Sequence, residues 1–292
     1  MIAPILAAVL PVLAVAAIGF LWVRSGQTFE NSTLTPLVVH IGTPCLIIAT
    51  FTKTTIPPDS FAVMALASVA AISCFGLAGA AILAASGFRV RTFLPALTFP
   101  NNGNLGLPLA LYAFGQEGLG YAIVFYAICM VGQFTVGQAI AAGVPNWRGI
   151  ARMPLIYSVV LGGALSVWQL PLPDWLSHAV SLIGGMTIPL MLLMLGASLA
   201  RLPVEAMGRV ALLAAFRIGL GVAVGVLVAF VFGLGDVARS VLILQCAMPP
   251  AVYNYLFAQR WNNQPEEVAS LVVIATSVST FSVPVLLHFL MK

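Results

Sequence analysis

Apolar residues run along the chain in long blocks that are separated by short polar breaks. A helix that crosses a bilayer needs about 20 predominantly apolar residues, and most of these blocks approach or exceed that length. Cutting the chain at its polar breaks predicts ten membrane-spanning helices, at residues 2–23, 34–52, 61–86, 93–114, 119–142, 153–170, 179–200, 207–232, 238–259 and 267–290. The connecting loops are short, so the pattern predicts an all-α polytopic membrane protein with no separate soluble domain.

The first block begins Met1-Ile2-Ala3-Pro4, with no basic stretch before its apolar run. It is also longer than the apolar core of a secretory signal. We therefore expect it to be a retained span.

Composition supports this class. The chain has 292 residues, of which 61% are hydrophobic and 7% are charged, whereas charged residues make up about 25% of an average soluble domain. The net charge is +4 and the basic residues are scattered, which argues against a nucleic-acid partner. Each of the four cysteines lies inside an apolar run and is interpreted as a small core residue rather than half of a disulfide; they are Cys45, Cys74, Cys129 and Cys246.

The basic residues are distributed unevenly between alternate loops, and this predicts the orientation. One side carries Arg24, Arg89, Arg91, Arg148, Arg152, Arg201, Arg209 and Arg260. The other side carries Lys53, Arg239 and Lys292. Because cytoplasmic loops are enriched in Lys and Arg, we expect both termini on the non-cytoplasmic side. The tryptophans agree, since all lie near predicted span ends, where an interfacial belt forms; they are Trp22, Trp147, Trp168, Trp175 and Trp261.

The ten spans divide into two sets of five near Asn146, and an odd number per half gives the halves opposite orientations. The second span of each half contains a proline and ends near another, Pro44 and Pro57 in one half and Pro189 and Pro203 in the other. In the fourth span of each half a proline precedes an asparagine at the same spacing; these pairs are Pro100 with Asn104 and Pro250 with Asn254. Inverted repeats of this kind are typical of secondary transporters, whose sites lie near the midplane between broken helices.

Those two fourth spans are predicted to be broken, crossing helices. The prolines remove backbone donors and clash with the preceding turn. Asparagines at bilayer depth are costly unless they face protein or a water-filled cavity. The positively polarised N-termini of the half-helices would form an anion site; the alternative is a pair of proline kinks in which asparagines replace lost backbone bonds. The candidate residues are Pro100, Asn101, Asn102, Gly103, Asn104, Gly106, Pro249, Pro250, Tyr253 and Asn254.

The segment from Pro100 to Pro108, Pro-Asn-x-Gly-x-x-Gly-x-Pro with additional asparagines, and the Met-Pro-Pro-Ala-Val-x-Asn segment from Met248 to Asn254 resemble the auxin efflux carrier family along the whole chain. That family includes the plant PIN-FORMED auxin exporters and bacterial permeases for malonate and malate. The resemblance implies a bacterial inner-membrane homodimer that works by an elevator movement. It also implies a scaffold domain of residues 1–57 and 146–203, and a transport domain of residues 58–145 and 204–292.

A single charge, Arg217, is predicted near the midplane, about 15 Å into its span by helical rise. No Asp or Glu lies deep in any span, so Arg217 has no obvious ion-pair partner. Two roles remain open: it holds carbonyls at the C-terminal ends of broken half-helices, or it adds positive field for an anionic substrate. Glycines at 219, 221 and 225 would let a neighbouring helix approach closely.

The same lack of carboxylates makes a potential-driven anion carrier more natural than a cation antiporter. Protonation of His40 and sodium coordination by Gln245, Thr276 and Ser279 are alternatives; packing and hydrogen bonding to the helix backbone are their ordinary roles. Tyr126 and Gln133 form a polar face that either contacts substrate or joins helices. Pro44 and Pro189 would bend helices beside the cavity.

An enzyme is not expected. The Gly233–Asp236 segment matches a pattern of intramembrane aspartyl proteases, but the other aspartates, Asp59 and Asp174, lie in loops, and such catalysis needs a second carboxylate to share a proton. There is no zinc, phosphate-loop or serine-hydrolase motif, so no cofactor or metal is predicted. The sequence therefore predicts a transporter of a small mono- or dicarboxylate that binds at the crossover. The alternatives are a sodium-coupled carrier similar to bile-acid symporters and a channel-like or sensory protein.

Overall fold

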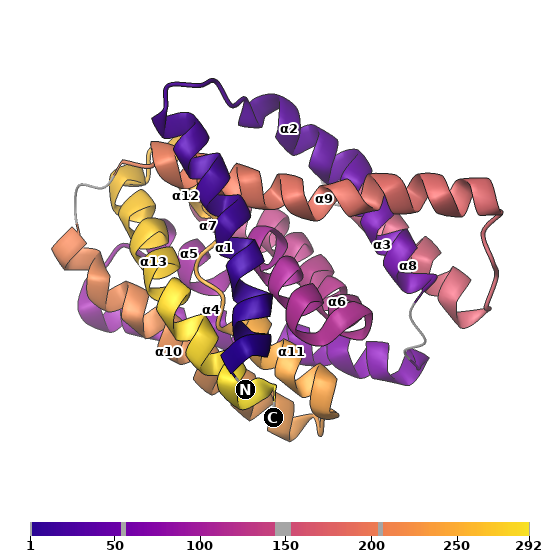
Figure 1. Cartoon of the computed structure of the whole chain (residues 1–292). Coiled ribbons are helices and arrows are strands. Elements are labelled where there is room, and N and C mark those ends of the chain that lie inside the picture. The colour runs from indigo at the N-terminus through magenta and orange to yellow at the C-terminus, as the bar shows by residue number, and fades with distance from the viewer. Residues whose placement is uncertain (1, 54–56, 144–152, 204–206, 292) are drawn as a thin grey trace.

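The computed structural model describes residues 2–53, 57–143, 153–203 and 207–291. The predicted boundary at Asn146 and the loop with Trp147, Arg148 and Arg152 lie outside these described residues. Within them, the structure consists of helices and loops with one isolated β-bridge, so the all-α prediction is confirmed (Figure 1). The helices of the first half are α1 (Ile2–Arg24), α2 (Asn31–Leu37), η1 (Val38–Gly42), α3 (Thr43–Phe51), α4 (Pro58–Ser86), α5 (Val90–Thr98), η2 (Asn102–Gly106), α6 (Leu107–Gly132), η3 (Gln133–Gly137) and α7 (Gln138–Ala142). Those of the second half are α8 (Pro154–Val167), α9 (Asp174–Arg201), α10 (Met207–Val231), α11 (Asp236–Cys246), α12 (Val252–Arg260) and α13 (Pro265–Leu290).

Seven helical segments of the described chain are long and apolar enough to cross a membrane. One of them, Asn102–Ala142, is 41 residues long and contains a sharp turn at Gly115, where φ is 66° and ψ is −157°. Glycine adopts that backbone conformation without the steric cost that a side chain would add. The turn falls at the break predicted between the spans 93–114 and 119–142. The helix α8 is shorter, at 14 residues.

Two of the π-helical turns lie just before prolines. The turn η1 precedes Pro44, and η2 precedes Pro108. A proline inside a helix lacks the N–H group and its ring crowds the carbonyl one turn earlier. Widening that turn relieves the clash, and such π-turns are common at functional sites.

Helix α9 is packed closely against its neighbours through glycines. A Cβ at Gly19 of α1 would clash with the Leu193 backbone, and one at Gly196 would clash with the Ala16 backbone. Farther along α9, a Cβ at Gly184 would lie 3.0 Å from the backbone of Leu46 in α3. Figure 1 shows α9 crossing the bundle beside α1 and α3, with both chain termini together at one end of the view.

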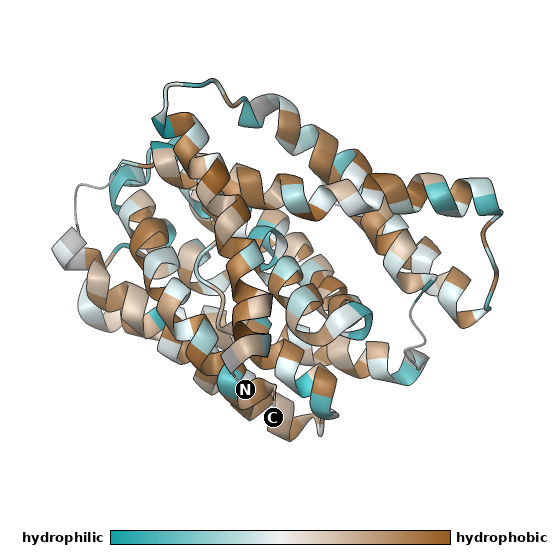
Figure 2. Ribbon diagram, in the orientation of Figure 1, coloured by the Kyte–Doolittle hydropathy of each residue, from teal (hydrophilic) through white to brown (hydrophobic). Residues whose placement is uncertain are grey.

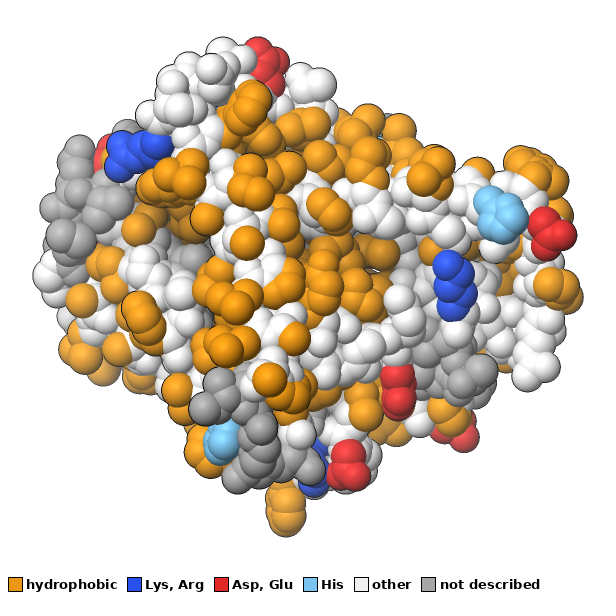
Figure 3. Space-filling model, viewed as in Figure 1, with side chains coloured by type: hydrophobic (Ala, Val, Ile, Leu, Met, Phe, Trp, Pro, Cys, Tyr) orange, Lys and Arg blue, Asp and Glu red, His pale blue; other side chains and the backbone are white. Residues whose placement is uncertain are grey.

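The outer surface is largely apolar. Hydrophobic positions occur along every long helix (Figure 2). Hydrophobic side chains are spread across the face seen in Figure 3, where the few charged side chains lie mainly toward the edges. Trp22, Trp168 and Trp175 are exposed near helix ends, as expected of an interfacial belt. These features are those of a multi-pass membrane protein.

Candidate functional site

The backbone of two interrupted helical segments meets inside the bundle. Helix α5 ends at Thr98 and α11 ends at Cys246. The chain is then non-helical until Asn102 in the first segment and Val252 in the second. The two irregular stretches pair as an antiparallel bridge between Pro100 and Pro250. The Asn101 amide donates to the Pro249 carbonyl at 2.7 Å, and the Ala251 amide donates to the Phe99 carbonyl at 3.1 Å. These two bonds give partners to amide and carbonyl groups that lie in non-helical backbone and have no helical hydrogen bond.

Two buried asparagines cap the C-terminal end of the opposite half-helix. Asn254 Nδ2 donates to the Phe99 carbonyl at the end of α5, at 3.0 Å. Asn102 Nδ2 donates to the backbone carbonyl and to Oε1 of Gln245 near the end of α11, at 3.1 and 2.8 Å. By its spacing from the proline, Asn104 is predicted to correspond to Asn254. In the structure, however, Asn102 makes the contacts that correspond to those of Asn254. The helix after Pro100 begins with a π-turn at Asn102, whereas the helix after Pro250 begins as an α-helix at Val252, so equal spacing from the proline does not give equal contacts.

Arg217 reinforces the end of α11. Its side chain is fully buried and its Nη1 donates to the Cys246 carbonyl at 3.0 Å. Its guanidinium carbon lies 4.5 Å from the centre of the Phe75 ring, a cation–π arrangement. This contact is the one expected if the residue holds half-helix carbonyls, and Arg217 does not line the cavity described below.

Close approach of α10 to the crossover depends on Gly221 and Gly225. A Cβ at Gly221 would clash with the Cys246 carbonyl, and one at Gly225 would lie 2.9 Å from the Cα of Ile243. Gly219 has no atom within 4 Å of the corresponding position, so its predicted role in helix contact is wrong. The reason is geometric, since Gly219 lies on the exposed face of α10.

Gly221→Ala and Gly219→Ala are therefore a matched pair on one helix. The first substitution overpacks a backbone contact and should cost about 1–3 kcal/mol. The second should be neutral or stabilising by up to about 1 kcal/mol, because alanine is the better helix former. Thermal unfolding of both purified variants in detergent measures the difference, and equal melting temperatures would contradict the close contact.

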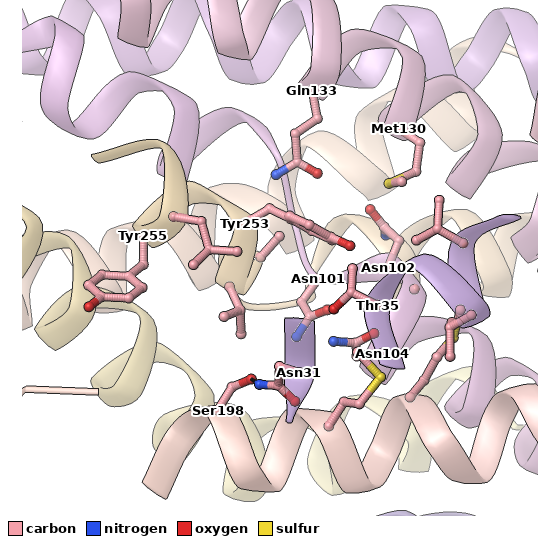
Figure 4. A pocket seen from close by; sticks show the side chains of 18 of the residues that line it. Asn31, Thr35, Asn101, Asn102, Asn104, Met130, Gln133, Ser198, Tyr253 and Tyr255 are labelled. Carbon is pink, nitrogen blue, oxygen red and sulfur yellow. Dashed lines mark hydrogen bonds between the residues drawn. The ribbon is translucent and has the colours of Figure 1, made fainter. Parts of the chain in front are cut away.

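A cavity of about 270 Å³ opens beside the crossover (Figure 4). Its walls come from α2, η1, the second half of α9, the crossover segments and α6 with Gln133. Gly103 and Asn104 lie in the first turn of one helix and Val252 and Tyr253 in the first turn of the other, and all four residues line the cavity. First-turn amides have no intrahelical acceptor and carry partial positive charge. The structure thus places two positive helix ends at the cavity, while the negative ends are covered by Asn254, Asn102 and Arg217.

Two crossover asparagines remain available at this cavity. Asn101 is 4% exposed and its Nδ2 has no hydrogen-bond partner among the described residues. Asn104 likewise makes no side-chain hydrogen bond within the described chain, and it lies near Asn101 and Thr35 in Figure 4. A buried unpaired donor is costly, so an acceptor entering the cavity would be stabilised by these amides.

Several predicted residues complete the wall or brace it. Tyr126 lines the cavity and packs against Gly103. A Cβ at Gly103 would lie only 2.9 Å from the Tyr126 ring. Gln133 Nε2 donates to Asn254 Oδ1 at 3.1 Å, which makes it part of a helix-joining seam as well as of the cavity wall. A Cβ at Gly106 would clash with Gln245, so that glycine admits the Gln245 side chain to its contact with Asn102.

Other predicted residues lie elsewhere. His40 is exposed, its Nδ1 is 3.0 Å from the Pro36 carbonyl, and it does not line the cavity. Thr276 and Ser279 donate to carbonyls one turn back in α13, at 2.7 and 2.8 Å, and line a separate, mostly apolar cavity of about 90 Å³. Pro44 follows η1 without lining the main cavity, and Pro189 lines a second cavity instead.

The cavity also includes residues that the sequence did not single out. Asn31 donates to Ser198 Oγ at 2.9 Å, and with Thr35 and Tyr255 these residues line its polar part. Arg201 is the one charged residue among the described lining residues. The sequence showed it only as a basic residue at a span end, and nothing in the hydropathy pattern distinguishes it from the other loop arginines.

Two interrupted helices bridged inside an apolar helical bundle, with a cavity that exposes amide groups at the interruption, are typical of multi-pass membrane transporters. The chain matches the family described as membrane transport protein over residues 4–146 and 141–287. It therefore belongs to that family, the auxin efflux carrier family, as the motifs predicted.

Similar proteins come from plants and archaea. An auxin efflux carrier component 1 from Arabidopsis thaliana is 27% identical over 140 residues, which are 46% of this chain and 22% of that protein. An uncharacterized transporter from Methanothermobacter thermautotrophicus is 24% identical over 65% of this chain and 64% of its own length. Another from Methanocaldococcus jannaschii is 23% identical over 84% of this chain and 85% of its own.

Proposed function

We propose that the protein is a secondary-active or potential-driven carrier for a small organic anion, a mono- or dicarboxylate that binds at the crossover. The observation that carries this proposal is the electrostatic asymmetry of the 270 Å³ cavity. Two helix N-termini and the unpaired Asn101 amide face it, and no Asp or Glu is among its described lining residues. Such ends bind carboxylates through their free backbone amides.

The ligand is proposed to be small. Typical ligand pockets have volumes of about 300–1,000 Å³, and this cavity lies just below that range. Its wall includes apolar side chains such as Val38, Met191 and Met194, which suit the carbon skeleton of an organic acid. Plant relatives named as auxin efflux carriers support an organic acid as substrate.

We propose ten membrane crossings arranged as two inverted repeats. In support, α5 with α6 up to Gly115 corresponds to α11 with α12, and each pair is interrupted at the bridged prolines. Residues 1–57 and 146–203 would form the scaffold of a homodimer in the bacterial inner membrane. Residues 58–145 and 204–292 would form a transport domain that moves as an elevator, with the termini outside the cytoplasm.

The sodium-coupled alternative receives less support from the geometry. Thr276 and Ser279 line a separate cavity and do not line the cavity at the crossover. The Gln245 side chain is engaged by Asn102. We therefore expect transport without a sodium requirement.

The proposal predicts electrogenic transport by the purified protein in liposomes. Capacitive currents would be recorded while malonate, malate and indole-3-acetate are applied in turn, with and without sodium and a proton gradient. Saturable, sodium-independent currents of negative charge are expected for at least one acid. Currents that require sodium would favour the symporter, and a folded protein that is silent with every acid would overturn the anion assignment. Non-saturating flux without counterflow would indicate a channel.

A further inference from the structure

A second cavity of about 200 Å³ lies between α3, α6 and the first half of α9. Its polar lining consists of Thr50, Lys53, Tyr112, Gln116 and Ser181. Like the crossover cavity, it contains one charged residue, a cation, and no carboxylate among its described lining residues. Lys53 is exposed and makes no ion pair with another described residue.

The two cavities lie at opposite ends of the same pair of helices. The continuous segment α2–η1–α3 contributes residues 31–39 to the crossover cavity and residues 46–53 to the second. Helix α9 runs the other way, because residues 181–189 line the second cavity and residues 191–201 line the first. Each segment spans roughly 30 Å between its two ends at 1.5 Å per residue, which is about the thickness of the hydrocarbon core. In a bilayer that these two segments span, the cavities would open toward opposite faces.

A packed layer separates the cavities in this conformation. Leu46, Ile188 and Leu192 belong to the main hydrophobic core, and Gly184 brings α9 against the α3 backbone. The crossover residues Pro100 to Asn104 line only the cavity on the Arg201 side. In this conformation a ligand at the crossover thus has access only to the cavity on the Arg201 side. The second cavity is present at the same time on the Lys53 side.

We propose that the second cavity is an anion-binding station on the opposite membrane face, with Lys53 as its fixed cation and with Arg201 in the same role at the crossover cavity. It would receive the same carboxylate after the crossover has moved past the seam between α3 and α9. Lys53 and Ser181 both lie in the proposed scaffold, so they stay in place when the crossover moves, and the Ser181 hydroxyl adds a donor for a carboxylate group. This inference rests on the proposed anion transport.

Side-specific kinetics test the proposal. Proteoliposomes would be sorted into the two orientations by affinity capture on a C-terminal tag. Uptake of radiolabelled malonate, malate and indole-3-acetate would then be measured from each face. Lys53→Gln should raise the half-saturating concentration roughly fivefold for acid presented at the Lys53 face, with less than a twofold change at the other face. Arg201→Gln should give the reverse pattern, and Lys53→Arg should restore wild-type values.

The matched controls are charge removals on each face at residues that line neither cavity. Arg24 lies over Phe20 at the end of α1, and Arg239 pairs with Asp236 at 2.8 Å. Arg24→Gln and Arg239→Gln should leave both half-saturation values unchanged. If the wild type transports an acid but Lys53→Gln behaves like Arg239→Gln, the second station is wrong and the proposed function stands. If the folded wild type transports none of the acids, both proposals fall.

Discussion

Arg217→Ala is expected to lose at least about 3 kcal/mol of folding free energy and to abolish transport. The substitution leaves the buried Cys246 carbonyl without its side-chain donor, which costs about 1–3 kcal/mol. It also empties a fully buried volume beside Phe75, and large-to-small changes at such sites cost about 2–5 kcal/mol. The melting temperature in detergent should fall by roughly 6 °C or more, and proteoliposomes should show no saturable current.

Two further variants separate the roles considered for Arg217. Arg217→Met keeps most of the buried volume without charge, and replacing a buried ion by an apolar group is often tolerated. Arg217→Lys keeps the charge but loses the planar guanidinium geometry. If Arg217 acted by supplying positive charge for an anionic substrate, the lysine variant would transport like the wild type while the methionine variant would not. We expect both to fall short, with methionine recovering part of the stability. A stable and fully active Arg217→Ala would contradict both roles.

The helical layout could be predicted because hydropathy and proline positions act locally. The block from 61 to 86 became a single helix, Pro58–Ser86, and the proline-asparagine segments became interruptions. The turn at Gly115 fell where the polar break lay. These features depend on the apolar length that a bilayer requires and on the backbone donors that prolines lack. Both can be determined from the sequence alone.

Which asparagines brace the fold and which face the cavity could not be predicted in the same way. Whether an asparagine caps a carbonyl or faces a cavity depends on the rotation of the helix about its axis. The π-turn at 102–106 changes that rotation. The same holds for Arg201, whose position at the cavity follows from how α9 packs against η1 and η2. Tertiary packing, rather than the residue pattern, decides such cases.

The different contacts of the two asparagines lead to the second large expected effect. Asn254 is 2% exposed and bonded to both Phe99 and Gln133, whereas Asn104 faces the cavity without a side-chain partner in the described chain. Asn104→Ala should leave the melting temperature unchanged and raise the half-saturating concentration of the transported acid roughly tenfold to hundredfold. That range corresponds to one hydrogen bond to a charged group, about 1.5–3 kcal/mol.

Asn254→Ala should instead destabilise the fold, because it removes a cap from α5 and leaves the buried Gln133 amide unpaired, at about 1–3 kcal/mol. Transport falls in this variant through loss of the crossover geometry. Gln259→Ala, an exposed amide on the same helix α12, is the matched control and should behave like the wild type in both assays. The double variant Asn104→Ala with Asn254→Ala should transport nothing. Wild-type flux in that double variant would remove the crossover from the mechanism, and equal destabilisation by the two single substitutions would show that both asparagines brace the fold and neither binds substrate.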